Sequence, residues 1–288
     1  MVDRIGKQIK RFWPLIKSLQ TGLLLFTGFA GFISARCPYL NVLTALGMIG
    51  SLFLAISGST VLNMVYDRDI DSKMQRTCLR PLPAGTVSTR EALILGSAMS
   101  VLGVATALVM DSLYGLVILA GFVIDVGVYT ILLKRRTAWA VVWGGIAGAM
   151  PVLAGRVLAI GMIDWVGIAL AMSVLFWIPT HIMTFSLRHQ SDYECAGIPT
   201  FPSRYGVHHT QRFIAFSAIL AAIAMGVSAI GIGLTWGYLR VLIVLTAGLF
   251  LLAVGSMIRP SMGMNFGLFK YASLYMLGSM LLLAVQGL

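Results

Sequence analysis

The chain has 288 residues, of which 58% are hydrophobic and only 11% are charged, and its mean hydropathy is +0.91. Because soluble domains carry about 25% charged residues, this composition argues against secreted, disordered and water-soluble globular proteins and predicts an integral membrane protein. The net charge of +11 does not by itself indicate nucleic-acid binding, since the positions of Lys and Arg matter more in a membrane chain. The three cysteines show no paired spacing, which supports neither a disulfide framework nor a zinc site.

The first 18 residues interleave basic and apolar side chains at helical spacing. This pattern predicts a helix that lies in the membrane interface. A secretory signal peptide is the alternative, but no short apolar run with a small-residue cleavage site follows the basic stretch. We therefore expect residues 1–18 to be retained.

Nine apolar stretches follow, and each is long enough for a helix that crosses a bilayer, which takes about 20 residues. They lie at about 19–35, 40–66, 90–110, 112–133, 138–159, 163–187, 209–232, 236–258 and 268–287. The sequence therefore predicts an all-α, polytopic membrane bundle of nine transmembrane helices that forms a single domain over residues 1–288.

Eighteen of the 21 basic residues fall in the N-terminal arm and in alternate connections; the exceptions are Arg36, Arg156 and Arg240. By the positive-inside rule, the N-terminus is then cytoplasmic and the C-terminus lies outside. Two cytoplasmic connections, the first cap loop (67–89) and the second cap loop (188–208), are much longer than the others and hold five of the ten acidic residues. We expect function to reside there, because the other loops barely turn the chain.

An amide and two carboxylates, Asn63, Asp67 and Asp71, follow one another at intervals of four residues at the cytoplasmic end of the second span. On a helix they share one face, with successive members about 6 Å apart. Hard oxygen ligands of this kind suit Mg²⁺, which keeps coordination positions for phosphate oxygens. The alternative is a solvated helix end with ordinary surface charge, which is less favoured because few acids occur elsewhere in the chain.

The next segment, from Arg76 to Gly85, contains two prolines and a glycine that end the helix and stiffen the turn. Its arginines, Arg76 and Arg80, can fork onto an anionic group beside the metal. A pair of cations beside a Mg²⁺ site indicates a polyphosphate ligand. Attraction to lipid headgroups is the alternative for either arginine.

These residues resemble the UbiA superfamily of intramembrane prenyltransferases. The spacing Asn63-x-x-x-Asp67-x-x-x-Asp71 is similar to that family's first aspartate-rich motif, and Arg76-Thr77-x-x-Arg80-Pro81-Leu82-Pro83-x-Gly85 resembles its protoheme IX farnesyltransferase (heme O synthase) branch. Further segments that resemble this branch are Tyr129 with Leu133–Thr137, Gly144–Gly155, Pro179–His181 and Asp192–Pro199. The resemblance covers most of the chain and implies helices around a central cavity that opens laterally.

The resemblance implies transfer of a polyprenyl group, farnesyl or geranylgeranyl, from its diphosphate to a hydrophobic acceptor, with Mg²⁺ as cofactor. The implied metal ligands are Asn63, Asp67, Asp71 and Asp192. The implied diphosphate ligands are Arg76, Arg80, Lys134 and Arg188. Tyr129 and Lys134 are expected to act from the cavity side, although Lys134 could instead extend to the interface. Prenyl chain length and oligomeric state stay open.

The acceptor also stays open at this point. Other superfamily members carry an Asp-x-x-x-Asp pair where this chain has Arg188 and Asp192, and this departure also resembles the heme branch. The run Thr200–Gly206 is closer to quinone-type members. Heme B is therefore the first expectation, and an aromatic quinone precursor or a lipid is the alternative.

Two polar residues inside the spans are further candidates for substrate binding. Asp125 lies nine residues before Lys134, about 13 Å deep by helix rise, and an acid near the midplane is a candidate for function; a structural hydrogen bond between helices is the alternative. His181 follows Pro179 in the sixth span. It would serve a heme acceptor as an iron ligand or propionate partner, whereas a buried, hydrogen-bonded histidine would bind no ligand.

A carrier of Mg²⁺ or organic anions is the alternative of another class, because it would share midplane charge and cytoplasmic acids. Transporters usually show an inverted repeat, and none is visible in the sequence.

Overall fold

The computed structural model describes residues 6, 10–35 and 41–287. The predictions for Arg36 and for most of the first ten residues lie outside these ranges. Within them the chain forms helices joined by loops and contains no strand, which confirms the predicted all-α class.

The long helices are α2 (Ser18–Ile33), α3 (Val42–Tyr66), α5 (Thr89–Met110), α6 (Ser112–Phe122), which continues as the π-helix η2 (Val123–Leu133), α7 (Ala140–Ile160), α8 (Trp165–Arg188), α11 (Val207–Ile232), α12 (Trp236–Ile258) and α13 (Met262–Gly287). In the described part of the chain, eight spans are long and apolar enough to cross a membrane, with α6 and η2 counted together. A ninth is added if Lys10–Ile16 and Ser18–Ile33, which meet at a 53° bend, form one span. The polytopic membrane bundle is thus confirmed.

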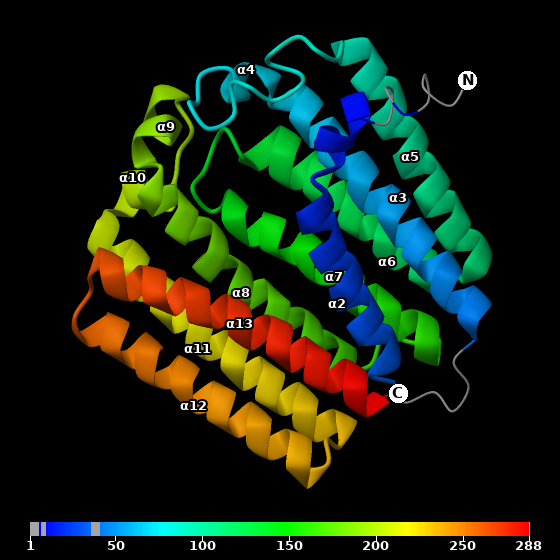
Figure 1. Cartoon of the computed structure of the whole chain (residues 1–288), viewed down its shortest axis with the longest axis vertical. Coiled ribbons are helices and arrows are strands. Elements are labelled where there is room, and N and C mark those ends of the chain that lie inside the picture. The colour runs from blue at the N-terminus through cyan, green and yellow to red at the C-terminus, as the bar shows by residue number, and fades with distance from the viewer. Residues whose placement is uncertain (1–5, 7–9, 36–40, 288) are drawn as a thin grey trace.

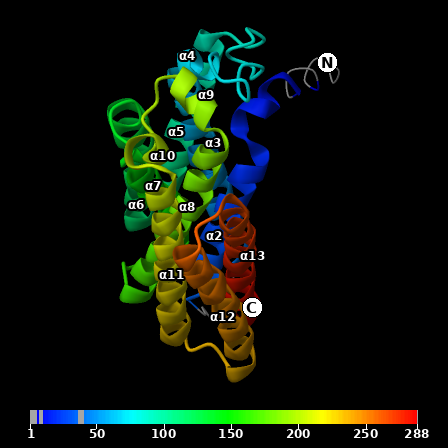
Figure 2. The same ribbon diagram turned by 90° about the vertical axis from the view of Figure 1, so that its left-hand side faces the viewer.

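The described residues also form short helices: η1 (Trp13–Ile16), which belongs to the possible ninth span, and α4 (Arg68–Asp71), α9 (Gln190–Cys195) and α10 (Phe201–Tyr205), which lie between the spans. Figures 1 and 2 show α4 and α9 at the same end of the bundle. Ile70 and Met74 from the first cap loop pack with Ala196 and Ile198 from the second. The two cap loops therefore form one structure over that end.

The last span begins earlier than hydropathy predicts. Because α13 starts at Met262 rather than near residue 268, Lys270 lies two turns inside the helix rather than in its first turn. Its side chain is exposed, and its ammonium nitrogen lies 4.7 Å from the centre of the Phe266 ring. A single lysine is compatible with the span because its apolar stem packs along the helix while its charge extends outward.

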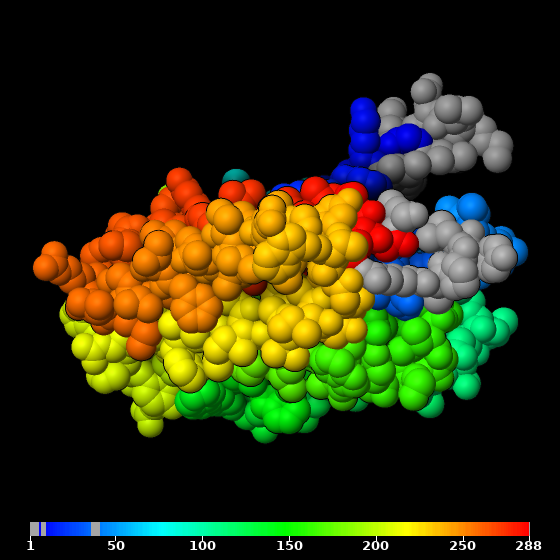
Figure 3. Space-filling model, turned by 90° about the horizontal axis from the view of Figure 1, so that it is seen from below, coloured from blue at the N-terminus to red at the C-terminus, as the bar shows by residue number. Residues whose placement is uncertain are grey.

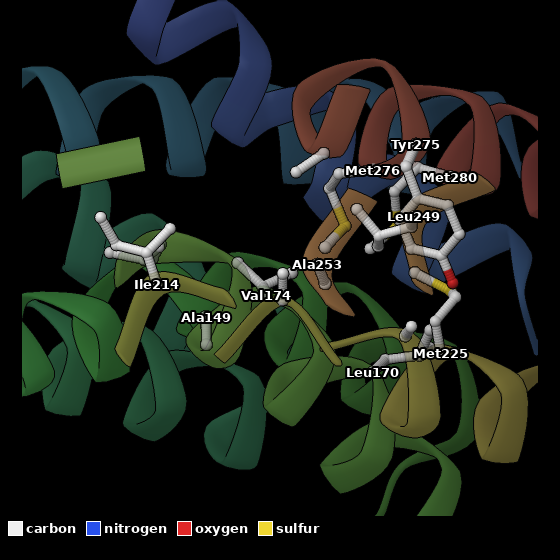
Figure 4. Close-up of a cluster of buried hydrophobic side chains, with 14 of the residues drawn as sticks. Ala149, Leu170, Val174, Ile214, Met225, Leu249, Ala253, Tyr275, Met276 and Met280 are labelled. Carbon is white, nitrogen blue, oxygen red and sulfur yellow. The ribbon is translucent and has the colours of Figure 1, made fainter. Parts of the chain in front are cut away.

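The helices pack in a bundle with α8 near its middle, between α7 and α11, while α13 contacts both α8 and α2 (Figure 1). Seen from below that view, α11 (yellow) lies between α12 (orange) and the green helices (Figure 3). The largest core cluster joins α7, α8, α11, α12 and α13. Figure 4 shows part of this cluster, in which small residues such as Ala149 and Ala253 are present together with larger ones such as Met276 and Met280.

Glycines bring α2 and α7 into direct backbone contact. A Cβ atom at Gly31 would lie 2.0 Å from the Val152 carbonyl oxygen, and one at Gly155 would lie 1.9 Å from the Gly28 carbonyl oxygen. Small residues permit such close packing in membranes, where helix association depends on van der Waals contact. This contact fixes α2 in the bundle and with it Lys17, the residue just before α2.

Candidate active site

The acid-rich end of α3 continues as helical turns into the first cap loop. The amide of Asp67 donates to the Asn63 carbonyl oxygen at 2.9 Å, and the amide of Asp71 donates to the Asp67 carbonyl oxygen at 2.8 Å. Two successive bonds of the α-helical type keep Asn63, Asp67 and Asp71 in register, as their spacing predicts. Each of the three side chains nevertheless meets a different partner.

Asp71 is bound by an arginine of its own loop. Arg80 Nη1 donates to Asp71 Oδ1 at 2.9 Å and to Oδ2 at 2.8 Å, and the Asp71 side chain is buried. Thr77 Oγ1 donates to the Asp71 carbonyl oxygen at 2.9 Å. The first cap loop thus folds back on the helix end and places Arg80, a predicted diphosphate ligand, beside a predicted metal ligand.

Asp67 pairs with a lysine from another helix. Lys134, which directly follows η2, donates from Nζ to Asp67 Oδ2. The second carboxylate oxygen, Oδ1, is buried and has no hydrogen-bond partner among the described residues. Such unpartnered buried atoms are uncommon in folded proteins, and a carboxylate oxygen suits a hard divalent cation.

The predicted Mg²⁺ ligands fit a metal only in part. Among the described residues, no three His, Cys, Asp or Glu side chains lie together as a metal centre. Asp192 Oδ1 accepts a 3.4 Å hydrogen bond from the Gln75 amide, so the second cap loop is held against the first. The donors that fit Mg²⁺ are therefore the free Oδ1 of Asp67 and the carboxylate of Asp71.

The Asn63 side chain is held in a hydrogen-bond chain between α3 and η2. Its Nδ2 donates to Asp125 Oδ2 at 2.9 Å, and Thr130 Oγ1 donates to its Oδ1 at 2.9 Å. Because an amide nitrogen only donates and an amide oxygen only accepts, the two partners fix the orientation of this amide, with Nδ2 toward Asp125 and Oδ1 toward Thr130. The hydrogen bond between helices, the alternative that the sequence left open for Asp125, is thus present.

The π-helix η2 brings this network and Tyr129 to the site. Its widened turns are seen in the 2.8 Å bond from the Lys134 amide to the Tyr129 carbonyl oxygen, five residues back, and such turns are frequent at functional sites. Lys134 Nζ lies 5.7 Å from the centre of the Tyr129 ring. A Cβ atom at Gly144 would lie 3.3 Å from the same ring, so the glycine-rich start of α7 makes room for it.

A site residue that the sequence did not single out is Lys17, at the break between η1 and α2. Among the described residues it alone combines a side chain with a positive φ, 45°, which is uncommon outside glycine. Burial and the positive charges of Arg80 and Lys134 lower the pKa of Lys17 to about 8, against the opposing effect of Asp71 and Asp67. Its position directly before the first apolar stretch could have indicated a site residue. The pattern of basic and apolar residues instead assigned Lys17 to the predicted interfacial helix.

The other two predicted diphosphate ligands, Arg76 and Arg188, form no ion pair with this cluster in the described structure. Arg76 is exposed and makes no ion pair with any residue that the structure describes. Arg188 is the last residue of α8, and its guanidinium lies 5.4 Å from the centre of the Phe266 ring of α13. Their roles stay predictions.

His181 lies in an aromatic cage. The ring centres of Trp177, Phe185 and Phe269 are 5.3, 5.1 and 5.2 Å from its own. Its Nδ1 is buried and has no hydrogen-bond partner within the described ranges. The alternative of a fully hydrogen-bonded histidine is therefore not seen at Nδ1.

A family model described as the UbiA prenyltransferase family matches residues 24–277. The chain belongs to this family. It is 40% identical over 219 residues to the protoheme IX farnesyltransferase of Thermofilum pendens, which covers 75% of each chain. The identity is 39% over 213 residues to that of Archaeoglobus fulgidus, covering 73% of this chain and 74% of the other. These relatives confirm the resemblance predicted from the Arg76–Gly85 run.

Solved structures of UbiA-type proteins share the fold. A digeranylgeranylglyceryl phosphate synthase superposes with a TM-score of 0.82 at 17% identity, covering 98% of this chain and 99% of the other. A UbiA homologue from Archaeoglobus fulgidus bound to GPP and Mg²⁺ gives 0.70 at 16% identity, covering 95% and 99%. At these identities the likeness concerns the arrangement of helices, which is that of the UbiA bundle.

Proposed function

We propose that this protein transfers a polyprenyl group from an isoprenyl diphosphate to heme B, with Mg²⁺ as cofactor. The observation that carries the proposal is the cluster in which the charges of Lys17, Arg80 and Lys134 act on the carboxylates of Asp67 and Asp71. Three cations around two anions favour an anionic ligand. The named relatives supply the heme acceptor, and the homologue bound to GPP and Mg²⁺ supplies the substrate class.

Each residue of the cluster has a definite task in this reaction. Bound Mg²⁺ supplies charge that stabilises the departing diphosphate. Asp67 and Asp71 would hold the metal. Arg80 and Lys134, which pair with them in the structure, would then be free to bind the phosphate oxygens. The cap loops exclude water from the allylic cation while the acceptor attacks. Arg76, Arg188 and Asp192 are proposed to close the site from the two cap loops.

The acceptor is proposed from the heme-type relatives and from His181, whose free Nδ1 in an aromatic cage suits a planar ligand that offers an iron atom or propionates. A phenolic or lipid acceptor would need no such nitrogen. Added heme B should therefore show a shifted Soret band with purified protein. His181→Ala should reduce the shift.

The test is product analysis with purified protein in detergent. Farnesyl and geranylgeranyl diphosphate are each incubated with heme B or a hydroxybenzoate, with and without Mg²⁺, and the products are weighed by mass spectrometry. We expect prenylated heme and diphosphate release that needs both Mg²⁺ and heme. Prenylated hydroxybenzoate alone would reject the acceptor, and absence of any diphosphate release would reject the enzyme in favour of a carrier.

We also propose that the cap loops face the cytoplasm, on the basis of the basic residues in alternate connections. Cys78 and the exposed Cys195 lie in the two cap loops. In a Cys37→Ser variant, a membrane-impermeant maleimide should label the protein in inverted vesicles and leave it unlabelled in intact cells. The reverse pattern would invert the topology.

A further inference from the structure

A cavity of about 460 Å³ opens beside the second cap loop, away from the acidic cluster. It lies where the start of α7, helix α10, the first turns of α11 and the end of α12 meet. Its lining residues are Trp139, Phe201, Tyr205, His209, Arg212, Phe213, Phe216 and Met257. None of the proposed catalytic residues lines it.

Aromatic rings form the walls of this cavity and are held in fixed orientations. The Trp139 ring meets the Phe201 ring edge-on at 5.2 Å and the Phe213 ring at 5.8 Å between centres. Trp139 Nε1 donates to the Tyr205 hydroxyl at 2.9 Å. Tryptophan and tyrosine with an apolar body and a polar tip are typical of the depth at which lipid headgroups lie.

The charge at the cavity is positive and uncompensated. His209 and Arg212 stand one turn apart at the start of α11 and are exposed, and Arg212 makes no ion pair with any described residue. The sequence contains no Asp or Glu after Glu194, whereas Arg204, Arg212 and Arg259 all follow it on this side of the bundle. The charge of Arg212 is therefore free to attract an anionic ligand.

The cavity continues from this cation along an apolar path. Phe216 lies one turn beyond Arg212 on α11, about 6 Å farther along the helix axis, and is half exposed. Met257 faces it from α12 across the cavity. A cation at the headgroup level followed by apolar side chains fits a ligand with a phosphate at one end and a hydrocarbon chain at the other.

We propose that this cavity binds an anionic phospholipid, with its phosphate at Arg212 and His209 and one acyl chain along Phe216 and Met257. The lipid touches Trp139, which follows the turn after Lys134, and Phe201 and Tyr205 on the second cap loop. It thereby stabilises both segments that border the active site. The site is independent of the reaction, because its ligand is a component of the membrane.

The test measures the melting temperature of detergent-purified protein after addition of phosphatidylglycerol, phosphatidylcholine or inorganic phosphate. The variants are Arg212→Gln and Phe216→Ala, and the matched control is Arg240→Gln, an exposed arginine stacked on Trp236 at 5.2 Å on the same bundle but outside the cavity. Native mass spectrometry counts the bound lipid.

Phosphatidylglycerol should raise the melting temperature of the wild type and of Arg240→Gln by several degrees, and Arg212→Gln should lose at least half of this shift and most of the bound lipid. Phe216→Ala should lose part of it. Phosphatidylcholine should act weakly. An undiminished shift in Arg212→Gln overturns the proposal, and an equal shift with phosphate alone replaces the lipid by a simple anion.

Discussion

Partly buried ion pairs lie at both ends of the bundle, and they differ in how fully their polar atoms are satisfied. At the end opposite the cap loops, Arg156 donates from Nε and Nη2 to the two oxygens of Asp164 at 2.8 and 2.7 Å. Its Nη1 donates to the carbonyl and hydroxyl oxygens of Ser34 at 3.0 and 2.9 Å. Asp164 also accepts the Gly167 amide at 2.8 Å and so caps α8. This network joins α2, α7 and α8.

The pairs under the cap loops lack this completeness. Asp67 keeps a buried oxygen without a partner in the described structure, and Asp71 is held by a single nitrogen of Arg80. Lys17 adds a further positive charge, with a pKa lowered to about 8 by burial and by its basic neighbours. The comparison teaches that a balanced and satisfied network serves the fold, whereas an unbalanced one is left for a ligand.

The strongest test of this contrast is Arg156→Leu. The variant leaves the carboxylate of Asp164, which is 19% exposed, without its partner and removes the hydrogen bonds to Ser34. Loss of one partner of a fully buried pair costs about 3–5 kcal/mol, so this partly exposed pair should cost about 2–3 kcal/mol. We expect a large fall in melting temperature, with turnover per folded molecule close to that of the wild type. Arg240→Leu, at an exposed arginine, is the control and should unfold near the wild-type temperature. Unchanged stability in Arg156→Leu would remove the structural role.

At the other end, Asp71→Asn should act in the opposite way. The variant keeps the shape of the side chain but removes a charge that holds the metal, so turnover should fall by about 100-fold or more. The melting temperature should change far less than in Arg156→Leu. Diphosphate release at limiting Mg²⁺ is the measurement, and Asp67→Asn should behave alike. Near-normal release in either variant would contradict the metal role.

Lys17 should give a smaller effect that concerns substrate binding. Lys17→Met should raise KM for the prenyl diphosphate about tenfold, equivalent to roughly 1.4 kcal/mol of binding energy, and change kcat less. With a pKa near 8, Lys17 loses its charge as pH rises through that value. The wild-type KM should therefore increase above pH 8, whereas in Lys17→Arg, which stays charged, it should not. A parallel rise in Lys17→Arg would show that another group titrates.

Hydropathy and local motifs predicted the spans, the cap loops and the family, because long apolar runs and residues four apart on one helix are local properties. The pairings could not be predicted in the same way. Lys134 reaches Asp67 only because η2 lies beside α3, and Asn63 turns to Asp125 and Thr130 rather than to its motif partners. Lys17 joins the site through a left-handed turn. Each of these contacts depends on the tertiary structure. The sequence could therefore identify candidate site residues but not the side chains with which they pair.

The smallest effect on stability and turnover is expected at Asp69 of the first cap loop, whose ion pair with Arg135 is exposed. Arg135 donates from Nη1 and Nη2 to the carboxylate of Asp69 at 2.8 and 2.7 Å, and these hydrogen bonds lower the pKa of Asp69 below its usual value. Because the Asp69 side chain is 60% exposed, water screens the pair, and Asp69→Asn should cost at most about 1 kcal/mol.

A carboxylate with a depressed pKa stabilises the fold above its unfolded pKa, so this small contribution should disappear only as pH falls through the lower, folded value. Turnover should be unaffected, since Asp69 contacts none of the cluster residues. A loss of turnover as large as that of Asp71→Asn would show that charge anywhere in the cap loop suffices, and the contrast between satisfied and unsatisfied pairs would then fail.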